Sequence, residues 1–136
     1  MVYRQFYGES QKMESNTSWL ELNTTDPVTA VHFYSSTLGW EFEASQLPEG
    51  GDYWVAKHNN KPVGGIFSLT QDDDQEIPPH WMTYMQVDNI QKAQEAAQVS
   101  GGDVTRPTLQ LKGIGKLSII TDNDGALVGL IEKETH

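Results

Sequence analysis

Apolar and polar positions alternate at the start of the patterned part of the chain. Over residues 18–23, Leu20 and Leu22 are separated by Trp19, Glu21 and Asn23. A period of two is typical of a β-strand, because successive side chains point to opposite faces. The alternation therefore predicts a first strand here.

A helix is predicted directly after this strand. Asp26 suits the N-cap position and Pro27 the first helical position. Apolar residues then recur at helical spacing, and Gly39 suits the C-cap. The members of that stripe are Val28, Val31, Tyr34 and Leu38.

The remaining pattern predicts seven more strands in the order expected for a repeat. In the first half, strands are predicted at 40–43, 53–57 and 63–69, with a loop over 47–52 and a hairpin turn at 58–61. Residues 70–80 carry acids and prolines and predict a connector. The second half predicts a strand at 81–87, a helix between Asp88-Asn89 and Gly101-Gly102, and strands at 103–105, 117–121 and 127–131.

The two halves superimpose in one register. Trp19 lies seven residues before Asp26, as Trp81 lies seven before Asp88, and Gly65 falls on Gly129. The repeat predicts an α+β fold of two βαβββ modules, which form an open, eight-stranded, barrel-like cleft with a helix behind each half. The predicted organisation is an N-terminal arm (1–17) and one domain (18–136), divided into module one (18–70), a linker (71–80) and module two (81–133).

Several of these motifs resemble the vicinal-oxygen-chelate superfamily, which contains glyoxalase I, the bleomycin-resistance proteins and the extradiol dioxygenases. The opening resemblance lies in residues 19–27, Phe33-Tyr34 and 38–40, and the closing one in the hairpin 122–125. The likeness runs from about Trp19 to Glu132. It implies the same two-module fold, a ligand cleft and a homodimer.

The resemblance also locates the superfamily's metal ligands, and there the sequence departs from the pattern. Carried over, the four ligand positions hold Trp19, Gly65, Trp81 and Gly129. None of these side chains can ligate a metal, because indole offers only an N–H donor and glycine offers nothing. His80 is expected to point away from the cleft, one residue out of register with Trp81. We therefore predict no metal and no cofactor.

The replacements suggest a different kind of site. A large aromatic paired with a glycine in each half would leave flat slots for a planar or cationic ligand. The predicted ligand-binding residues are Trp19, Glu21, Trp54, Gly65, Phe67, Trp81, Thr83 and Gly129. The alternative is that Trp19 and Trp81 fill the vacated site and complete a core.

Composition and charge narrow the partners. The formal net charge of −10 disfavours nucleic acid and would attract cationic ligands. The chain has no cysteine, which excludes disulfides and thiolate chemistry and is compatible with the cytoplasm, where we expect the protein. No apolar run is long enough for a membrane helix, so no membrane partner is expected. The segment 113–116 lacks the rest of a phosphate-binding loop.

Three functions remain open from the sequence. The first is a metal-free protein that binds, and by analogy sequesters, a small molecule. The second is a metal-dependent glyoxalase-like lyase, isomerase or dioxygenase that uses displaced ligands such as Glu21 and His80. The third is an interaction or regulatory protein whose cleft is filled.

Overall fold

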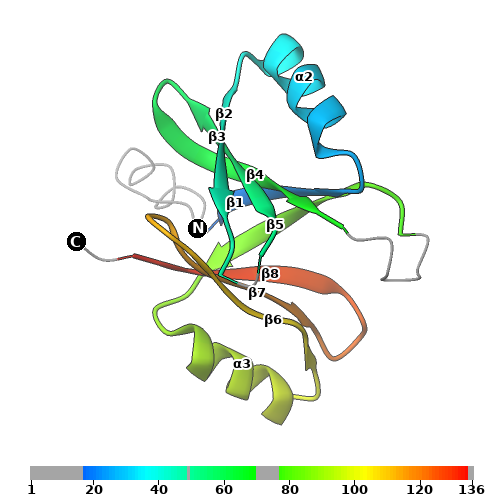
Figure 1. Cartoon of the computed structure of the whole chain (residues 1–136). Helices are drawn as coiled ribbons and strands as arrows, with labels where there is room; N and C mark the ends of the chain where they lie inside the picture. The colour runs from blue at the N-terminus through cyan, green and yellow to red at the C-terminus, as the bar shows by residue number, and fades with distance from the viewer. Residues whose placement is uncertain (1–16, 49, 70–76, 135–136) are drawn as a thin grey trace, which may run out of the picture.

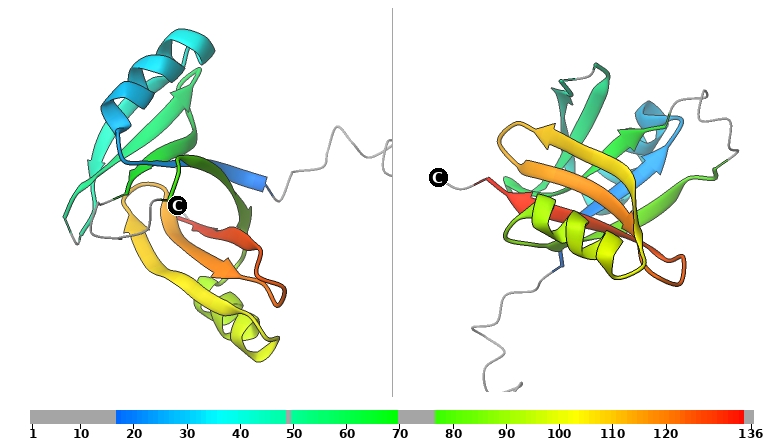
Figure 2. Two further views of the ribbon diagram at one scale, coloured as in Figure 1. Left: turned by 90° about the vertical axis from the view of Figure 1, so that its right-hand side faces the viewer. Right: turned by 90° about the horizontal axis from the view of Figure 1, so that it is seen from below.

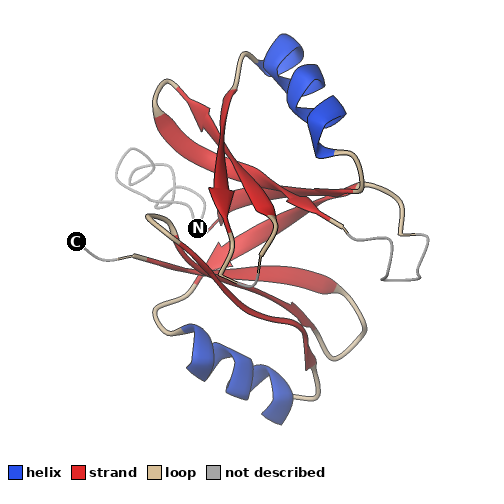
Figure 3. Ribbon diagram, viewed as in Figure 1, coloured by secondary structure: helices blue, strands red, loops and turns tan. Residues whose placement is uncertain are grey.

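The computed structural model describes residues 17–48, 50–69 and 77–134 of the chain. This part forms eight strands and two helices (Figures 1 and 3). In chain order these are β1 (Thr17–Thr24), α2 (Pro27–Leu38), β2 (Glu41–Gln46), β3 (Asp52–His58), β4 (Lys61–Ser68), β5 (His80–Gln86), α3 (Ile90–Val99), β6 (Asp103–Leu111), β7 (Gly115–Thr121) and β8 (Leu127–Lys133).

The order of the elements confirms two βαβββ modules. All eight strands form one sheet in the order β2-β3-β4-β1-β5-β8-β7-β6. Within each module the first strand lies parallel to the last, and the modules join where β1 pairs antiparallel with β5. The sheet curls into a half-barrel, with α2 and α3 on its outer side (Figure 2).

Both helices begin at a predicted N-cap residue, and α2 also ends at its predicted C-cap. The Asp26 carboxylate accepts a hydrogen bond from the backbone N–H of Thr29, and Asn89 does the same for Lys92. Gly39 ends α2 with a φ of 70°, a conformation that costs glycine little because it has no Cβ. The second helix ends at Val99 with Ser100 as its C-cap, just before the predicted Gly101-Gly102. The local chemistry of the sequence was sufficient for the other three boundaries.

The structure extends β6 well beyond the predicted strand at 103–105. It continues to Leu111, and its pairing with β7 shifts register twice on the way, once on either side of Arg106. Pro107 cannot donate to the ladder, so the irregularity falls next to it. In the segment 113–116, residues 113–114 lie in the turn before β7 and residues 115–116 begin that strand, so it forms no phosphate loop.

The predicted arm and linker lie largely outside the described residues. Thr17 is the first residue of β1, whereas positions 1–16 of the arm are not described. Likewise 71–76 of the linker are not described, and His80 already begins β5.

The concave face of the sheet is the hydrophobic core. Its cluster draws on strands of both modules: Trp19, Tyr53, Val55, Met82, Tyr84, Leu111, Leu117, Ile119 and Ile131. Apolar side chains therefore pack the floor of the expected cleft. In the described part of the chain, neither helix has the length and apolar character that crossing a membrane requires.

Candidate functional site

A fully buried glutamate lies at the centre of the concave face. Glu21 is 0% exposed and lies on β1, two residues after the buried Trp19. The alternation of the strand places both side chains on the inner face, as the sequence predicted. In the sheet register, Glu21 lies between Gly65 on β4 and Met82 on β5.

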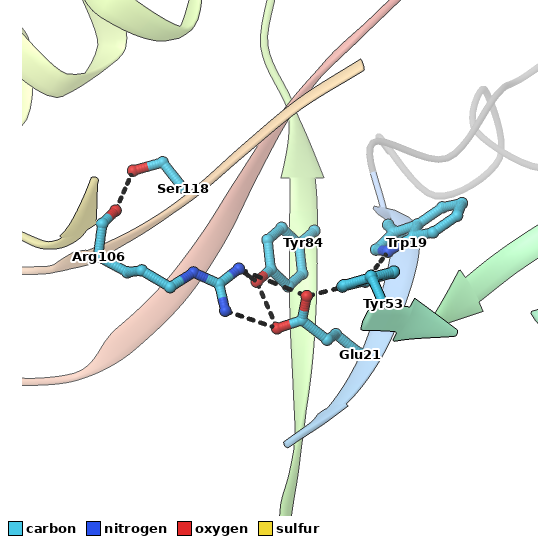
Figure 4. Close-up of polar contacts among 6 residues, drawn as sticks. All are labelled: Trp19, Glu21, Tyr53, Tyr84, Arg106 and Ser118. Atoms are coloured by element: carbon cyan, nitrogen blue, oxygen red, sulfur yellow. Dashed lines mark hydrogen bonds and ion pairs between the residues drawn. The ribbon is translucent and has the colours of Figure 1, made fainter. Parts of the chain in front are cut away.

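Both oxygens of Glu21 accept hydrogen bonds from tyrosines (Figure 4). Tyr53 Oη donates to Oε2 at 2.8 Å, and Tyr84 Oη donates to Oε1 at 2.7 Å. Tyr53 Oη in turn accepts a hydrogen bond from Trp19 Nε1 at 2.8 Å. The indole N–H that sequence analysis assigned to a ligand is therefore used inside the protein.

Arg106 supplies the opposite charge from the second module. Its Nη1 lies 3.2 Å from Oε1 of Glu21, its Nη2 lies 3.4 Å from Oε2, and Nη2 also donates to Tyr84 Oη. The side chain of Arg106 is only 15% exposed. This paired, fork-like contact balances the charge of the buried carboxylate. Removing one partner of such a buried ion pair lowers the stability of the folded state by about 3–5 kcal/mol.

The irregular backbone of β6 positions Arg106. Its carbonyl oxygen accepts a hydrogen bond from Ser118 Oγ at 2.7 Å, and Ser118 Oγ accepts one from Gln94 Nε2 of α3 at 2.9 Å. Ser118 is fully buried. The bulge thus frees the carbonyl of Arg106 from the β6–β7 ladder. Gln94 of α3 helps to hold that carbonyl in place through Ser118.

The electrostatics of this cluster keep each group in one protonation state. Burial, and next the charge of Glu21, raise the pKa of Tyr53 and of Tyr84 well above the ordinary value for a phenol. Burial lowers the pKa of Arg106, but the charge of Glu21 and the other polar contacts outweigh it, so the pKa is raised overall. The two phenols therefore stay hydrogen-bond donors and the guanidinium stays charged.

The two glycines predicted to open slots are instead covered by these tyrosines. A Cβ atom on Gly65 would lie within 2.6 Å of Cζ of Tyr53, and one on Gly129 within 2.6 Å of Cδ1 of Tyr84. Each ring lies where a side chain at the glycine would project. The space next to the glycines is therefore filled by the protein itself.

The orientation expected for Trp81 is wrong. Its indole donates to Tyr34 Oη of α2 at 3.2 Å and is 41% exposed, so Trp81 lies on the outer face. Thr83, two residues later, is exposed on the same face. Met82 and Tyr84 point inward instead, and His80 shares their side of β5. The one-residue difference arises because the N-cap of α3 is Asn89 and not Asp88. Met82 stands seven residues before Asn89, as Trp19 stands seven before Asp26, so Met82 is the residue equivalent to Trp19.

The residues at the superfamily's metal positions do not fit a metal ion. The inner face presents Trp19, Gly65, Met82 and Gly129 there, and Glu21 is already bound to a cation and two hydroxyls. A catalytic divalent site requires about three nitrogen or oxygen ligands. Within residues 17–48, 50–69 and 77–134, no three histidine, aspartate or glutamate side chains are grouped to supply them.

An open pocket lies beside this cluster. It has a volume of about 380 Å³, and its walls come from the start of α2, the β2–β3 loop, β3, β4 and β6. The residues are Pro27, Val28, Leu47, Gly50, Gly51, Asp52, Trp54, Phe67, Ser68 and Leu109. Two predicted residues, Trp54 and Phe67, are brought together here. The guanidinium of Arg106 lies over the Phe67 ring, 4.5 Å from its centroid.

A second hollow, of about 460 Å³, lies near the start of α3. Its walls carry charges of both signs, from Asp88, Lys116, Glu132, Lys133 and Glu134. Glu132 is already used there, since Oε1 accepts a hydrogen bond from the backbone N–H of Ile90. Its walls lack aromatic groups, so it suits an apolar ligand less well than the pocket beside Phe67.

Sequence reasoning did not select Tyr84 or Arg106 as site residues. A signal existed for Arg106, because a glutamate on the inner face of a central strand requires a cation, and the chain has only two arginines. Tyr84 gave no such signal. Its role depends on a strand that approaches Glu21 from the other module.

The sequence matches the family model described as "Glyoxalase/Bleomycin resistance protein/Dioxygenase superfamily" over residues 17–130. A relative in Mycobacterium tuberculosis, named as the glyoxylase CFP32, is 33% identical over 128 residues, covering 93% of this chain and 49% of its own. The anthracycline biosynthesis protein DnrV of Streptomyces peucetius is 21% identical over 127 residues, 85% of this chain and 46% of its own. The chain thus spans about half the length of these relatives.

Solved structures share the fold at low sequence identity. Methylmalonyl-CoA epimerase from Mycobacterium tuberculosis has a TM-score of 0.63 at 13% identity, over 90% of this chain and 93% of its own. A Bacillus halodurans protein, BH1468, has a TM-score of 0.64 at 12% identity, over 88% and 95%. With the family match and the two-module sheet, the chain belongs to the glyoxalase/bleomycin resistance protein/dioxygenase superfamily.

Proposed function

We propose that this chain binds a small, mostly apolar, planar molecule in the pocket beside Phe67, without a metal ion. The observation that carries the proposal is the state of Glu21. Its carboxylate is committed to Arg106, Tyr53 and Tyr84. The centre of the cleft therefore serves as a rigid floor, and the open volume lies next to it.

The walls of the pocket favour an apolar ligand. Phe67 offers aromatic surface on the inner face, and Leu47 and Leu109 offer aliphatic surface from opposite halves of the sheet. Trp54 borders the pocket from the other face of β3, since its neighbour Tyr53 points inward. A cavity of about 380 Å³ is within the usual range for small-molecule sites. Aromatic walls bind flat molecules well because they bury a large area at little cost in conformational entropy.

The local charges favour a neutral ligand over the cation that the net charge suggested. Asp52 is the only acid among the described residues of the pocket wall. The nearest charged pair, Glu21 and Arg106, is internally balanced, and Arg106 already lies over the face of Phe67. A cationic ligand would therefore find little uncompensated negative charge and would approach a guanidinium.

Two other functions compete with this proposal. A metal-dependent enzyme needs ligands, and although His80 shares the inner face of β5, Glu21 would have to leave three partners to join it. An interaction protein with a filled cleft is favoured by the packed floor, and disfavoured by the open pocket. The superfamily supports sequestration of a ligand only by analogy.

We further propose that the chain forms a homodimer. The two relatives are each about twice as long as this chain, which is compatible with a second, covalently joined copy. Apolar side chains also lie exposed outside the core, namely Leu20 and Trp81 on the outer face of the sheet, at 39% and 41%, and Phe33 on α2, at 56%. Pairing two such faces would bury them.

The first experiment combines metal analysis with binding. Protein purified without chelators or a metal-affinity column is analysed by inductively coupled plasma mass spectrometry, then titrated calorimetrically with naphthalene. We expect almost no metal and saturable binding. Trp54→Ala and Leu109→Ala should each weaken binding roughly tenfold, whereas Leu127→Ala, an exposed leucine on β8 outside the pocket, should not.

Other results would favour the competing functions. Close to one divalent ion per chain would favour the enzyme. Metal-free protein that binds neither naphthalene nor its oxygen-bearing analogues, at concentrations up to their solubility, would favour the interaction protein.

A further inference from the structure

Two hydrogen-bond donors on the inner face have no partner. In the described part of the chain, the buried side-chain polar atoms that lack a hydrogen bond are Asn23 Nδ2 and Arg106 Nε. Asn23 is only 2% exposed. Buried polar atoms are nearly always bonded, because leaving one unsatisfied costs free energy, so a pair of orphans of the same kind requires an explanation.

Both orphans are donors, and both adjoin Phe67. Asn23 is the partner of Phe67 in the parallel pairing of β1 with β4, so the two side chains leave neighbouring strands on the same face. The guanidinium of Arg106 lies over the same ring, 4.5 Å from its centroid. The two donors thus flank the aromatic residue that forms part of the pocket wall.

The other nitrogens of Arg106 are engaged. Nη1 and Nη2 donate to the two oxygens of Glu21, which leaves Nε as the guanidinium nitrogen that has no hydrogen bond. Asn23 stands two residues beyond Glu21 on the same face of β1. The arrangement offers two unpaired N–H groups to whatever lies next to Phe67.

We propose that these two N–H groups recognise a carbonyl oxygen on the bound molecule, so that the ligand class is a planar aromatic ketone, aldehyde or quinone. This inference rests on the proposed function. An sp² oxygen has two lone pairs and can accept from both donors at once. The ligand meets Phe67 first, and rotation of that ring lets the oxygen reach the donors behind it.

The charge of the site selects a neutral carbonyl over a carboxylate. Glu21 balances the positive charge of Arg106, and the protein as a whole carries a net charge of −10. A carboxylate would lose its hydration without gaining an unpaired cation. The hydrogen bonds therefore supply the polar recognition, and the aromatic walls supply most of the affinity.

The test compares three probes of one shape, namely naphthalene, 2-acetylnaphthalene and 2-naphthoate, by calorimetric titration. Wild type is expected to bind 2-acetylnaphthalene about tenfold more tightly than naphthalene, and 2-naphthoate no more tightly than naphthalene. Asn23→Leu removes one donor, so the preference for 2-acetylnaphthalene should fall to about threefold or less while naphthalene binding is retained. Because Leu leaves no orphan, the melting temperature of the free variant should not fall.

Arg106→Lys is the second variant, since it keeps a cation for Glu21 but has no Nε. It should lose the ketone preference in the same way, which keeps the test valid if one variant folds poorly. Equal binding of naphthalene and 2-acetylnaphthalene by wild type, an undiminished preference in both variants, or tightest binding of 2-naphthoate would each overturn the inference. Failure of all three probes to bind would instead overturn the proposed function.

Discussion

The ring of Tyr53 lies where a side chain on Gly65 would project, with its Cζ within 2.6 Å of a Cβ built at that glycine. Gly129 and Tyr84 repeat the relationship in the second module. The glycines that first suggested open slots are thus required by two buried phenols. These phenols are the groups that hold Glu21 in place.

This packing predicts that Gly65→Ala destabilises the protein. The added methyl group must displace a ring that is fully buried, and overpacking of this kind costs about 1–3 kcal/mol. Urea denaturation of Gly65→Ala, Tyr53→Ala and the double variant measures the effect as a double-mutant cycle. The cost of the alanine should nearly vanish when Tyr53 is absent. An additive cycle would show that the ring and the glycine do not compete for space.

Glu21→Gln should lower the free energy of unfolding by about 3–5 kcal/mol, because it leaves Arg106 buried without a counter-charge. The matched control is Glu43→Gln. Glu43 pairs with Lys57 at 3.1 Å, but its side chain is 72% exposed, so the loss should be under about 1 kcal/mol. Guanidinium denaturation compares the two. Equal losses would mean that the Glu21 cluster contributes no more than a surface pair.

The raised pKa values of Tyr53 and Tyr84 predict the alkaline behaviour of the protein. The folded state keeps protons that the unfolded state releases above pH of about 10, so stability is complete below that pH and falls as the pH rises. Phenolate absorbance from these two residues should appear only together with unfolding, followed by circular dichroism. The double variant Tyr53→Phe, Tyr84→Phe should lack the part of the phenolate absorbance that appears with unfolding. Its persistence in the variant would contradict the assignment.

The proposed dimer predicts that a charge on the outer face disrupts association. Leu20 is 39% exposed in the single chain and lies on the central strand β1. Sedimentation equilibrium should report a dimer for wild type and a monomer for Leu20→Asp, because a second copy would bury the new carboxylate. Leu127→Asp, on an exposed leucine of β8, should stay dimeric. A monomeric wild type, or a dimeric Leu20→Asp, would place any interface elsewhere.

The sequence by itself determined the architecture, because the signals that specify it are local. Period-two alternation identified β1, and Asp26, Gly39 and Asn89 set helix boundaries through hydrogen bonds to nearby backbone groups. The duplicated register of the halves then specified two modules, and the family match agrees with that result. Trp19 and Glu21 were correctly placed on the inner face by the same alternation.

Only the tertiary structure decided what the centre of the cleft contains. Trp81 was placed on the wrong face because the repeats were aligned on Asp88, whereas Asn89 is the N-cap of α3. A shift of one residue reverses the side chains of a strand, and either residue is a suitable N-cap by its chemistry. Arg106 is 85 residues from Glu21 along the chain, and it reaches the carboxylate from an irregular stretch of β6 that no local pattern announced. A buried charge must be balanced, but which distant residue balances it is decided by how the two halves of the sheet curl together.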